Sequence, residues 1–209
     1  AAWWKNGLFY SAYDKPADGQ ELTAKNEFQK VFYHRLGDPQ AKDVLVYEDK
    51  AHPLRYFNLG VTEDERYAVL SVSEGTSGTE LLWKDLAKPA SKFEVLIPGF
   101  EYDSAVVDNV GDKFLVYTRV DAPNYRVVLV DPLKPAKENW APAIPEKPEV
   151  LVGASTGGGK LFCSYLKDAN TKVFEHELDG ALVREIALPA LGTAGGFGGW
   201  KDDTILFYT

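Results

Sequence analysis

A short strand-like run returns five times along the chain, and this repeat limits the possible folds more than any other feature. Its copies start at Leu8, Tyr67, Phe114, Leu161 and Ile205, at separations of 59, 47, 47 and 44 residues. A second set of runs starts at Val31, Leu81, Val127 and Val173, at separations of 50, 46 and 46 residues. A repeat of roughly 40 to 50 residues built only from strands is typical of a β-propeller, whose blades are four-stranded antiparallel sheets.

The repeat assigns strands to blades. We name the strands of a blade A to D from the propeller axis outward, so the first set is strand B and the second is strand C. Strand D then follows as Asp43–Tyr47, Phe93–Ile97 and Val183–Ala187, with a weak, proline-broken version near Trp140. We therefore expect an all-β, incomplete β-propeller over residues 1–209: most of one blade, three full blades and the start of a fifth. The approximate blades are residues 1–48, 55–98, 102–145, 149–189 and 192–209.

Composition excludes several classes of function. The net charge of −8 is spread along the chain, which argues against nucleic acid as a partner. No apolar run approaches the roughly 18 residues that span a bilayer, and no signal peptide is visible, so we expect no membrane partner. The single cysteine, Cys163, excludes an internal disulfide and leaves the redox compartment open. We expect a cytoplasmic protein, with the periplasm as the alternative, and a buried Cys163 that only fills the core.

One short motif resembles a catalytic site. Gly153–Gly157 fits the G-x-S-x-G pattern of a serine hydrolase, in which the serine stands on a sharp turn between a strand and a helix. Here the motif occupies the slot of the A–B turn and is followed by another strand. The three consecutive glycines that begin with Gly157 would also destabilise the start of a helix. We therefore interpret Ser155 as a turn residue.

No other motif indicates a cofactor or a metal. Gly192–Gly199 lacks the Lys-Ser/Thr of a phosphate-binding loop, and we expect it to be the innermost strand of the fifth blade. The histidines His34, His52 and His176 lack metal-ligand spacing. The acidic A–B turns lack the twelve patterned residues of a calcium loop. We expect neither a cofactor nor a metal, and no complete catalytic set.

Several segments in order resemble one known family. They are Gly7–Tyr13, Gln29–Gln40 with Asp43–Glu48, Ser71–Thr76, Leu82–Leu86, Asn124–Pro132 and Glu138–Trp140. Together they resemble the propeller of the prolyl oligopeptidase family of serine peptidases and cover essentially the whole chain. The segment from His34 to Glu48 is also similar to the related oligopeptidase B, whereas Asn124–Pro132 favours the prolyl enzymes.

The resemblance implies a function that the chain does not perform alone. Family members insert a seven-bladed propeller into an α/β-hydrolase domain, whose catalytic Ser, Asp and His follow it in sequence and are absent here. The implied partners are that hydrolase domain of the same polypeptide and short proline-containing peptides, with the propeller covering the active site and limiting substrate size. The alternatives are an oligopeptidase B-like propeller, a protein-binding scaffold without chemistry, or a complete enzyme that uses Ser155 or a metal.

The resemblance also locates candidate site residues in the B–C loops, which in the family face the hydrolase domain. Glu74 and Thr76 are candidates for the lip of the substrate cavity, and the residue matching Thr76 is a cysteine in some relatives. The insertion Asp14–Gln29 stretches the first repeat and is a candidate gating loop, or else a passive surface insertion. Its charged residues are expected to form ion pairs at the domain rim: Asp14, Lys15, Asp18, Glu21, Lys25 and Glu27.

Overall fold

The computed structural model describes residues 1–20 and 22–209, and the chain divides into two compact units, residues 1–101 and 102–209. Each unit contains two four-stranded antiparallel sheets, as expected for blades of a β-propeller. Among the described residues, the helical segments are two short 3-10 turns, Gln40–Lys42 and Lys137–Asn139. No helix in this part of the chain is long and apolar enough to cross a membrane. The all-β prediction is confirmed.

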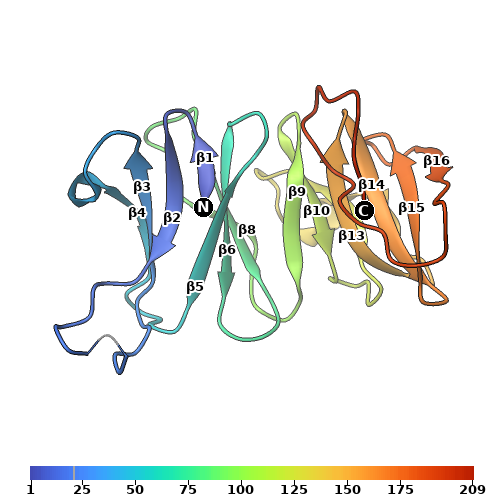
Figure 1. Ribbon diagram of the computed structural model, residues 1–209. Coiled ribbons are helices and arrows are strands. Elements are labelled where there is room, and N and C mark those ends of the chain that lie inside the picture. Colours follow the sequence, from blue (N-terminus) through green and yellow to red (C-terminus); the bar gives the residue numbers. More distant parts are fainter. Residues whose placement is uncertain (21) are drawn as a thin grey trace. The chain divides into compact units, whose positions relative to one another are not determined.

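Unit 1 holds the first two sheets, whose strands follow one another in chain order (Figure 1). The first consists of β1 (Ala2–Trp4), β2 (Gly7–Ala12), β3 (Lys30–Arg35) and β4 (Val44–Glu48). The second consists of β5 (Tyr56–Val61), β6 (Tyr67–Ser73), β7 (Glu80–Asp85) and β8 (Glu94–Ile97). In both sheets the repeated runs form the second and third strands, as predicted.

Unit 2 holds the other two sheets, again in chain order. The third sheet consists of β9 (Ser104–Val110), β10 (Lys113–Thr118), β11 (Arg126–Val130) and β12 (Ala141–Ile144). The fourth consists of β13 (Val150–Gly157), β14 (Lys160–Lys167), β15 (Asn170–His176) and β16 (Leu182–Ile186). The weak strand expected near Trp140 does form, as β12 directly after it. Its Pro142 is tolerated because an outer strand has a neighbour on one side only.

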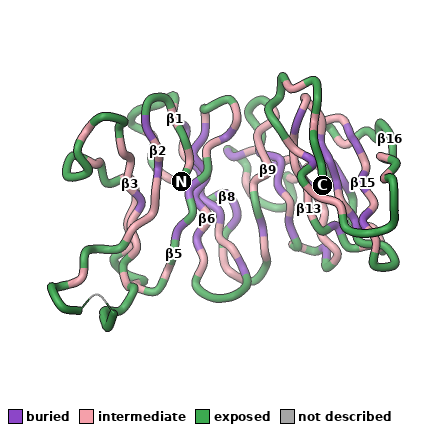
Figure 2. Tube along the Cα trace, viewed as in Figure 1, coloured by how far each residue is buried: buried purple, intermediate pink, exposed green. Residues whose placement is uncertain are grey.

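The two sheets of each unit pack on each other through their apolar faces. In unit 1, one buried cluster joins Phe9 and Val31 of the first sheet to Leu59 and Leu70 of the second. In unit 2, a matching cluster joins Leu115 to Cys163 and its neighbours. Figure 2 shows this burial as purple segments along the strands, with exposed green loops. Each fully buried large side chain stabilises the fold by roughly 1.5 to 3 kcal/mol relative to exposure, so the sheets are held mainly by each other.

The start of a fifth blade is not formed as strands. Residues 187–209 contain no strand in the described structure, although the backbones of Gly195 and Thr209 exchange two hydrogen bonds of 2.9 Å. The side chains of Ile205 and Phe207 are 70% and 82% exposed. One reciprocal pair of hydrogen bonds does not make a ladder, and a glycine-rich segment has few side chains to pack. The prediction that Gly192–Gly199 and Ile205–Thr209 form strands was therefore wrong.

Candidate functional site

The candidate site residues lie at one edge of the sheets. In an antiparallel blade, the B–C loop and the connection to the next blade emerge at the same end. We call this end of each unit the loop edge: residues 13–20, 22–29, 49–55 and 74–79 in unit 1, and 119–125, 145–149 and 168–169 in unit 2. Hydrogen bonds tie its segments together, for example from Phe28 N to the Pro53 carbonyl (2.7 Å) and from Asn124 Nδ2 to the Lys147 carbonyl (3.1 Å).

Glu74 is held at the loop edge of unit 1 by an arginine from the preceding connection. Arg55 donates from Nε to Glu74 Oε1 at 2.6 Å, and its Nη1 lies 3.1 Å from Asp49 Oδ2. The guanidinium also lies over the ring of Phe100, 4.9 Å from its centroid. Because the Arg55 side chain is only 18% exposed, this pair is better shielded from water than an ordinary surface pair. Glu74 is therefore fixed in place.

The charges of this cluster support one another. Burial raises the pKa of Asp49, but the hydrogen bond from His52 (2.8 Å), a backbone N–H of Ala51 and the charges of His52 and Arg55 outweigh it, so the pKa lies below its usual value. For Arg55, burial lowers the pKa and is outweighed by Glu74 and Asp49. Both side chains are therefore charged at neutral pH. A carboxylate that is paired with an arginine in this way is suited to fixing the shape and charge of a loop, and not to transferring a proton.

Sequence reasoning located Glu74 and Thr76 but missed Arg55, Asp49 and Phe100. Thr76 lies exposed in the same loop as Glu74. The only sequence signal for the partners is the spacing of Asp49, His52 and Arg55 in one connection. That spacing does not reveal Glu74, which joins them from the next loop along the chain. Whether Glu74 and Thr76 form the lip of a substrate cavity stays a prediction.

The charged residues of the long B–C insertion form ion pairs with residues that are near them in the sequence. Asp14 accepts from Lys30 Nζ at 2.6 Å, Lys15 lies 3.8 Å from Asp18, and Lys25 lies 3.9 Å from Glu27. Glu21, the remaining candidate, lies outside the described residues. Exposed pairs of this kind contribute at most about 1 kcal/mol, so a partner domain could exchange them at little cost. The end of the insertion is anchored, since Gln29 Oε1 accepts from Phe57 N at 2.5 Å.

Ser155 lies in a strand, and the interpretation of it as a turn residue was wrong. It is part of β13, opposite Phe162 of β14, and the turn between these strands consists of Gly158 and Gly159 alone. Both glycines have positive φ (57° and 71°), which permits a two-residue hairpin and lets the strand continue past Ser155. Its Oγ donates to the carbonyl of Phe197. A nucleophile elbow needs a strand-to-helix turn, and none is present at this serine.

Changing Ser155 to alanine in the full-length protein should leave kcat within about twofold of the unchanged protein, because the hydroxyl binds backbone and makes no transition-state contact. Steady-state kinetics with a chromogenic peptide would measure this. A loss of roughly a thousandfold would restore Ser155 as a nucleophile.

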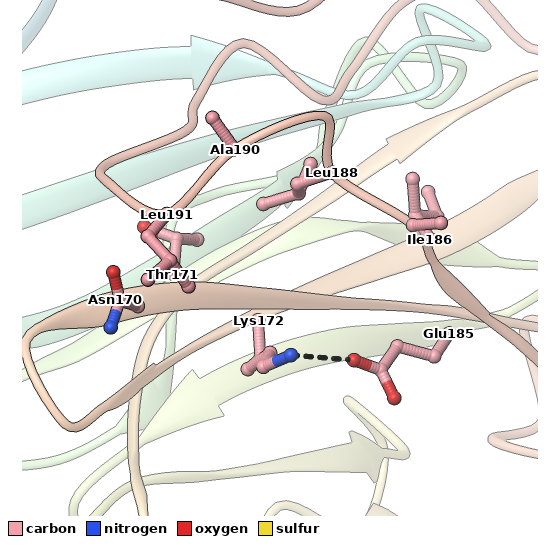
Figure 3. A pocket seen from close by; sticks show the side chains of 9 residues that line it. Asn170, Thr171, Lys172, Glu185, Ile186, Leu188, Ala190 and Leu191 are labelled. Atoms are coloured by element: carbon pink, nitrogen blue, oxygen red, sulfur yellow. Dashed lines mark ion pairs between the residues drawn. The ribbon is translucent and has the colours of Figure 1, made fainter.

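The hollow beside β15 and β16 does not hold a catalytic set either. Figure 3 shows a hollow of about 520 Å³ between β15, β16 and the segment that follows, where Lys172 pairs with Glu185 at 3.2 Å and apolar Ile186, Leu188 and Leu191 line the same hollow. Its two charged side chains neutralise each other as an ion pair, and in the described part of the chain no hydrogen bond joins either of them to Thr171 as a base to a nucleophile. Within residues 1–20 and 22–209, no three His, Cys, Asp or Glu side chains are placed to hold a metal ion.

The sequence that forms these four sheets matches one protein family over its whole length. The family model for the prolyl oligopeptidase N-terminal β-propeller domain matches residues 1–209. The chain belongs to the prolyl oligopeptidase family. This confirms the resemblance seen in the sequence, and it places all of the described blades in the family's propeller rather than in its catalytic domain.

Relatives and solved structures agree on the prolyl oligopeptidase propeller. The chain is 42% identical over 203 residues to a prolyl endopeptidase of Elizabethkingia miricola, covering 97% of this chain and 28% of that protein. Prolyl oligopeptidase A of Galerina marginata is 30% identical, with 90% and 27% covered. A solved structure from an analysis of two prolyl endopeptidases has a TM-score of 0.87 at 30% identity, with 99% and 30% covered.

A further solved structure shows the fold alone. Prolyl oligopeptidase B of Galerina marginata, bound to a 35mer hydrolysis and macrocyclization substrate, has a TM-score of 0.89 at 22% identity, with 99% of this chain and 30% of that one covered. The chain thus spans less than a third of the length of these relatives, and it corresponds to part of their propellers.

Proposed function

We propose that this chain is the non-catalytic propeller portion of a serine peptidase that cleaves short peptides after proline. The observation that carries the proposal is the 42% identity to a prolyl endopeptidase over 97% of the chain. In this proposal the α/β-hydrolase domain of the same polypeptide supplies the catalytic groups. The propeller covers the active site and limits which substrates enter.

The loop edge of each unit is the surface proposed to face the hydrolase domain. It carries the long insertion, the Glu74 loop and the connections between blades, so it offers charged groups in exposed ion pairs. Weak exposed ion pairs suit a cover that opens and closes, because each can be exchanged for about 1 kcal/mol or less. In the same proposal, Glu74 and Thr76 lie at the lip of the cavity.

A substrate panel tests the proposal on the full-length protein. Chromogenic dipeptide amides that end in proline, arginine or alanine should be cleaved with a kcat/KM at least about 100-fold higher for proline. A preference for arginine would indicate an oligopeptidase B-like enzyme instead. The absence of any cleavage, with a correctly folded protein, would favour the binding-scaffold alternative.

Size limitation needs its own measurement, because the solved structure of the fungal relative is bound to a 35mer, which is much longer than the short peptides proposed here. We expect a proline-containing peptide of about ten residues to be cleaved and the same segment inside a folded protein to be left intact. Cleavage of both at similar rates would contradict a covering role for the propeller.

Shortening the insertion Asp14–Gln29 to a four-residue turn should change kcat/KM for long peptides more than for dipeptide-sized substrates. The reason is that the insertion lies at the loop edge, where it would obstruct a long substrate more than a short one. Steady-state kinetics with matched short and long substrates would measure the two ratios. Equal effects on both, or none, would make the insertion a passive one.

A further inference from the structure

A hollow between the two sheets of unit 1 combines aromatic walls with an unbalanced positive charge. It has a volume of about 230 Å³ and includes residues of the connection that follows β7. That connection lies at the end of unit 1 opposite the loop edge, so the hollow is separate from the Glu74 loop. We call it the Lys84 hollow. The lining residues used below are Trp4, Phe9, Tyr33, Val44, Lys84 and Phe93.

Packed rings of the first sheet line one part of the hollow. The ring of Trp4 lies 5.8 Å from that of Phe9 and 5.6 Å from that of Tyr33, between centroids. The polar atoms of this group are engaged, because Trp4 Nε1 donates to the carbonyl of Glu65 and the Tyr33 hydroxyl to that of Trp4, both at 3.1 Å. Phe93, directly before β8, lines the same hollow from the second sheet. The surface offered to a ligand is therefore mainly aromatic, and it suits a ring.

Lys84 of β7 lies on the face of its sheet that packs on the first sheet. It is paired in register with Ala68 of β6 and stands two residues from Leu82, and both of these belong to the core cluster between the sheets. Side chains two positions apart in a strand point to the same face. Lys84 is therefore a partly buried lysine on an apolar face, where it lines the hollow.

The charge of Lys84 is not balanced by a carboxylate. Among residues 1–20 and 22–209, no Asp or Glu oxygen lies within 4.0 Å of its Nζ, whereas Lys88 at the same hollow pairs with Asp85 at 3.2 Å. Nζ of Lys84 is 5.9 Å from the centroid of Phe93, which is the outer limit of a cation–π interaction. A partly buried ammonium group without a counter-ion costs free energy, and an anion in the hollow would offset that cost.

We propose that the Lys84 hollow binds a small aromatic monocarboxylate, with its ring against Trp4 and Tyr33 and its carboxylate on Lys84. One unbalanced positive charge matches one carboxylate. An apolar cavity of about 150 Å³ accommodates benzene. A volume of about 230 Å³ therefore admits one ring with its carboxylate and excludes a peptide chain. The site goes beyond the proposed peptidase function, because it lies away from the surface proposed to face the hydrolase domain.

Ligand-observed NMR titration of the full-length protein with phenylacetate tests this site. We expect saturable binding with a Kd of roughly 0.1 to 1 mM. Phenylacetamide has the same ring without the charge and should bind at least about fivefold more weakly. Acetate lacks the ring and should bind at least about tenfold more weakly. Equal binding of phenylacetate and either compound would overturn the proposal, and tighter binding of a tripeptide that ends in phenylalanine would reassign the hollow to a peptide.

Lys84→Gln removes the charge and keeps most of the side chain. It should weaken phenylacetate binding at least about fivefold and leave phenylacetamide binding within about twofold, so that the preference for the acid disappears. Lys50→Gln is the matched control, because Lys50 is an exposed lysine of unit 1 at the loop edge. It should leave both affinities unchanged. A preference that survives Lys84→Gln, or that is lost equally in Lys50→Gln, would contradict the proposal.

Val44→Trp tests the position of the ligand independently of charge. Val44 lines the hollow and is 61% exposed on the outer strand β4, so a larger side chain can be placed there and would obstruct the hollow. Binding of both phenylacetate and phenylacetamide should fall at least about tenfold, with an unchanged circular dichroism spectrum. Unaltered binding in a folded Val44→Trp protein would show that the ligand lies elsewhere.

Treatment of the full-length protein with a serine-directed fluorophosphonate separates this site from the proposed active site. Phenylacetate should bind the treated and the untreated protein equally. Loss of binding on treatment would place the acid at the catalytic serine and overturn the inference. If the protein instead cleaves no peptide but still binds phenylacetate through Lys84, the proposed function fails and the Lys84 hollow stands.

Discussion

Replacing Gly78 with alanine is expected to lower the free energy of unfolding of the propeller by roughly 2 to 4 kcal/mol. Gly78 has φ +81°, a conformation that costs a residue with a Cβ about 1 kcal/mol, and it lies buried in the loop that carries Glu74. A Cβ at this position would also overlap the carbonyl group of Phe100, which is backbone and cannot rotate away. Relief of such overlap typically costs a further 1 to 3 kcal/mol.

Chemical denaturation of the full-length protein and hydrogen exchange of residues 73–101 would measure this effect. Gly99 provides a matched control, because it has nearly the same φ (+83°) and open space where the Cβ would lie. Gly99→Ala should therefore cost only about 1 kcal/mol. Similar losses in both variants would mean that backbone strain alone matters and that the packing of the loop on Phe100 does not hold it.

Cys163 is expected to react with iodoacetamide at least about 10³-fold more slowly in the native protein than in the denatured one. Its side chain is fully buried in unit 2, and burial raises the pKa of the thiol from 9.0 to about 12, against a smaller opposing effect of the charge of Lys147. The thiolate is the reactive form, and a rise of three pKa units lowers its fraction about 10³-fold at pH 8. Mass spectrometry of the peptide that contains Cys163 would follow the reaction.

The matched control is Thr76→Cys, which introduces a thiol at an exposed position of the Glu74 loop. A cysteine there should have an ordinary pKa near 8.5 and react at the rate of a free thiol. Rapid labelling of Cys163 in the native protein would instead show that unit 2 opens often. In that case the burial of its core would not protect the thiol.

The Glu74 loop shows how charge and packing together define the loop edge. Arg55 bridges Asp49 and Glu74 while lying over Phe100, and Gly78 brings the same loop against the backbone of Phe100. A change on either side would therefore move Glu74. For the proposed cover of a peptidase site, this means that the lip is positioned by the connection before β5 and by the segment after β8.

The repeat of strand-like runs predicted most of the fold. Second strands such as β6 and β10 are apolar along nearly their whole length because both of their faces are buried, and that property is visible as a continuous hydrophobic run. The spacing of the runs then predicted four strands per blade, and the order of several segments identified the family. These features are local or periodic, so the amino-acid sequence alone determines them.

The exact turns and the end of the chain depended on the tertiary structure. Ser155 was expected in a turn, but two glycines with positive φ complete the hairpin and leave the serine in β13. The expected fifth blade lacks strands, because hydrophobic alternation in Ile205–Thr209 forms a ladder only where paired strands surround it. Both errors concern which backbone segments pair with each other, and a local sequence pattern does not carry that information.

The candidate sites divide in the same way. The loops that carry Glu74, Thr76 and the charged insertion were located from the repeat, because strand order decides at which end each loop emerges. The pairing of Glu74 with Arg55, and the meeting of Lys84 with Trp4 and Tyr33 at one hollow, join residues 19 to 80 positions apart. Such contacts arise only when separate strands and connections fold against each other, so the sequence determined the blades and the tertiary structure decided the chemistry at their edges.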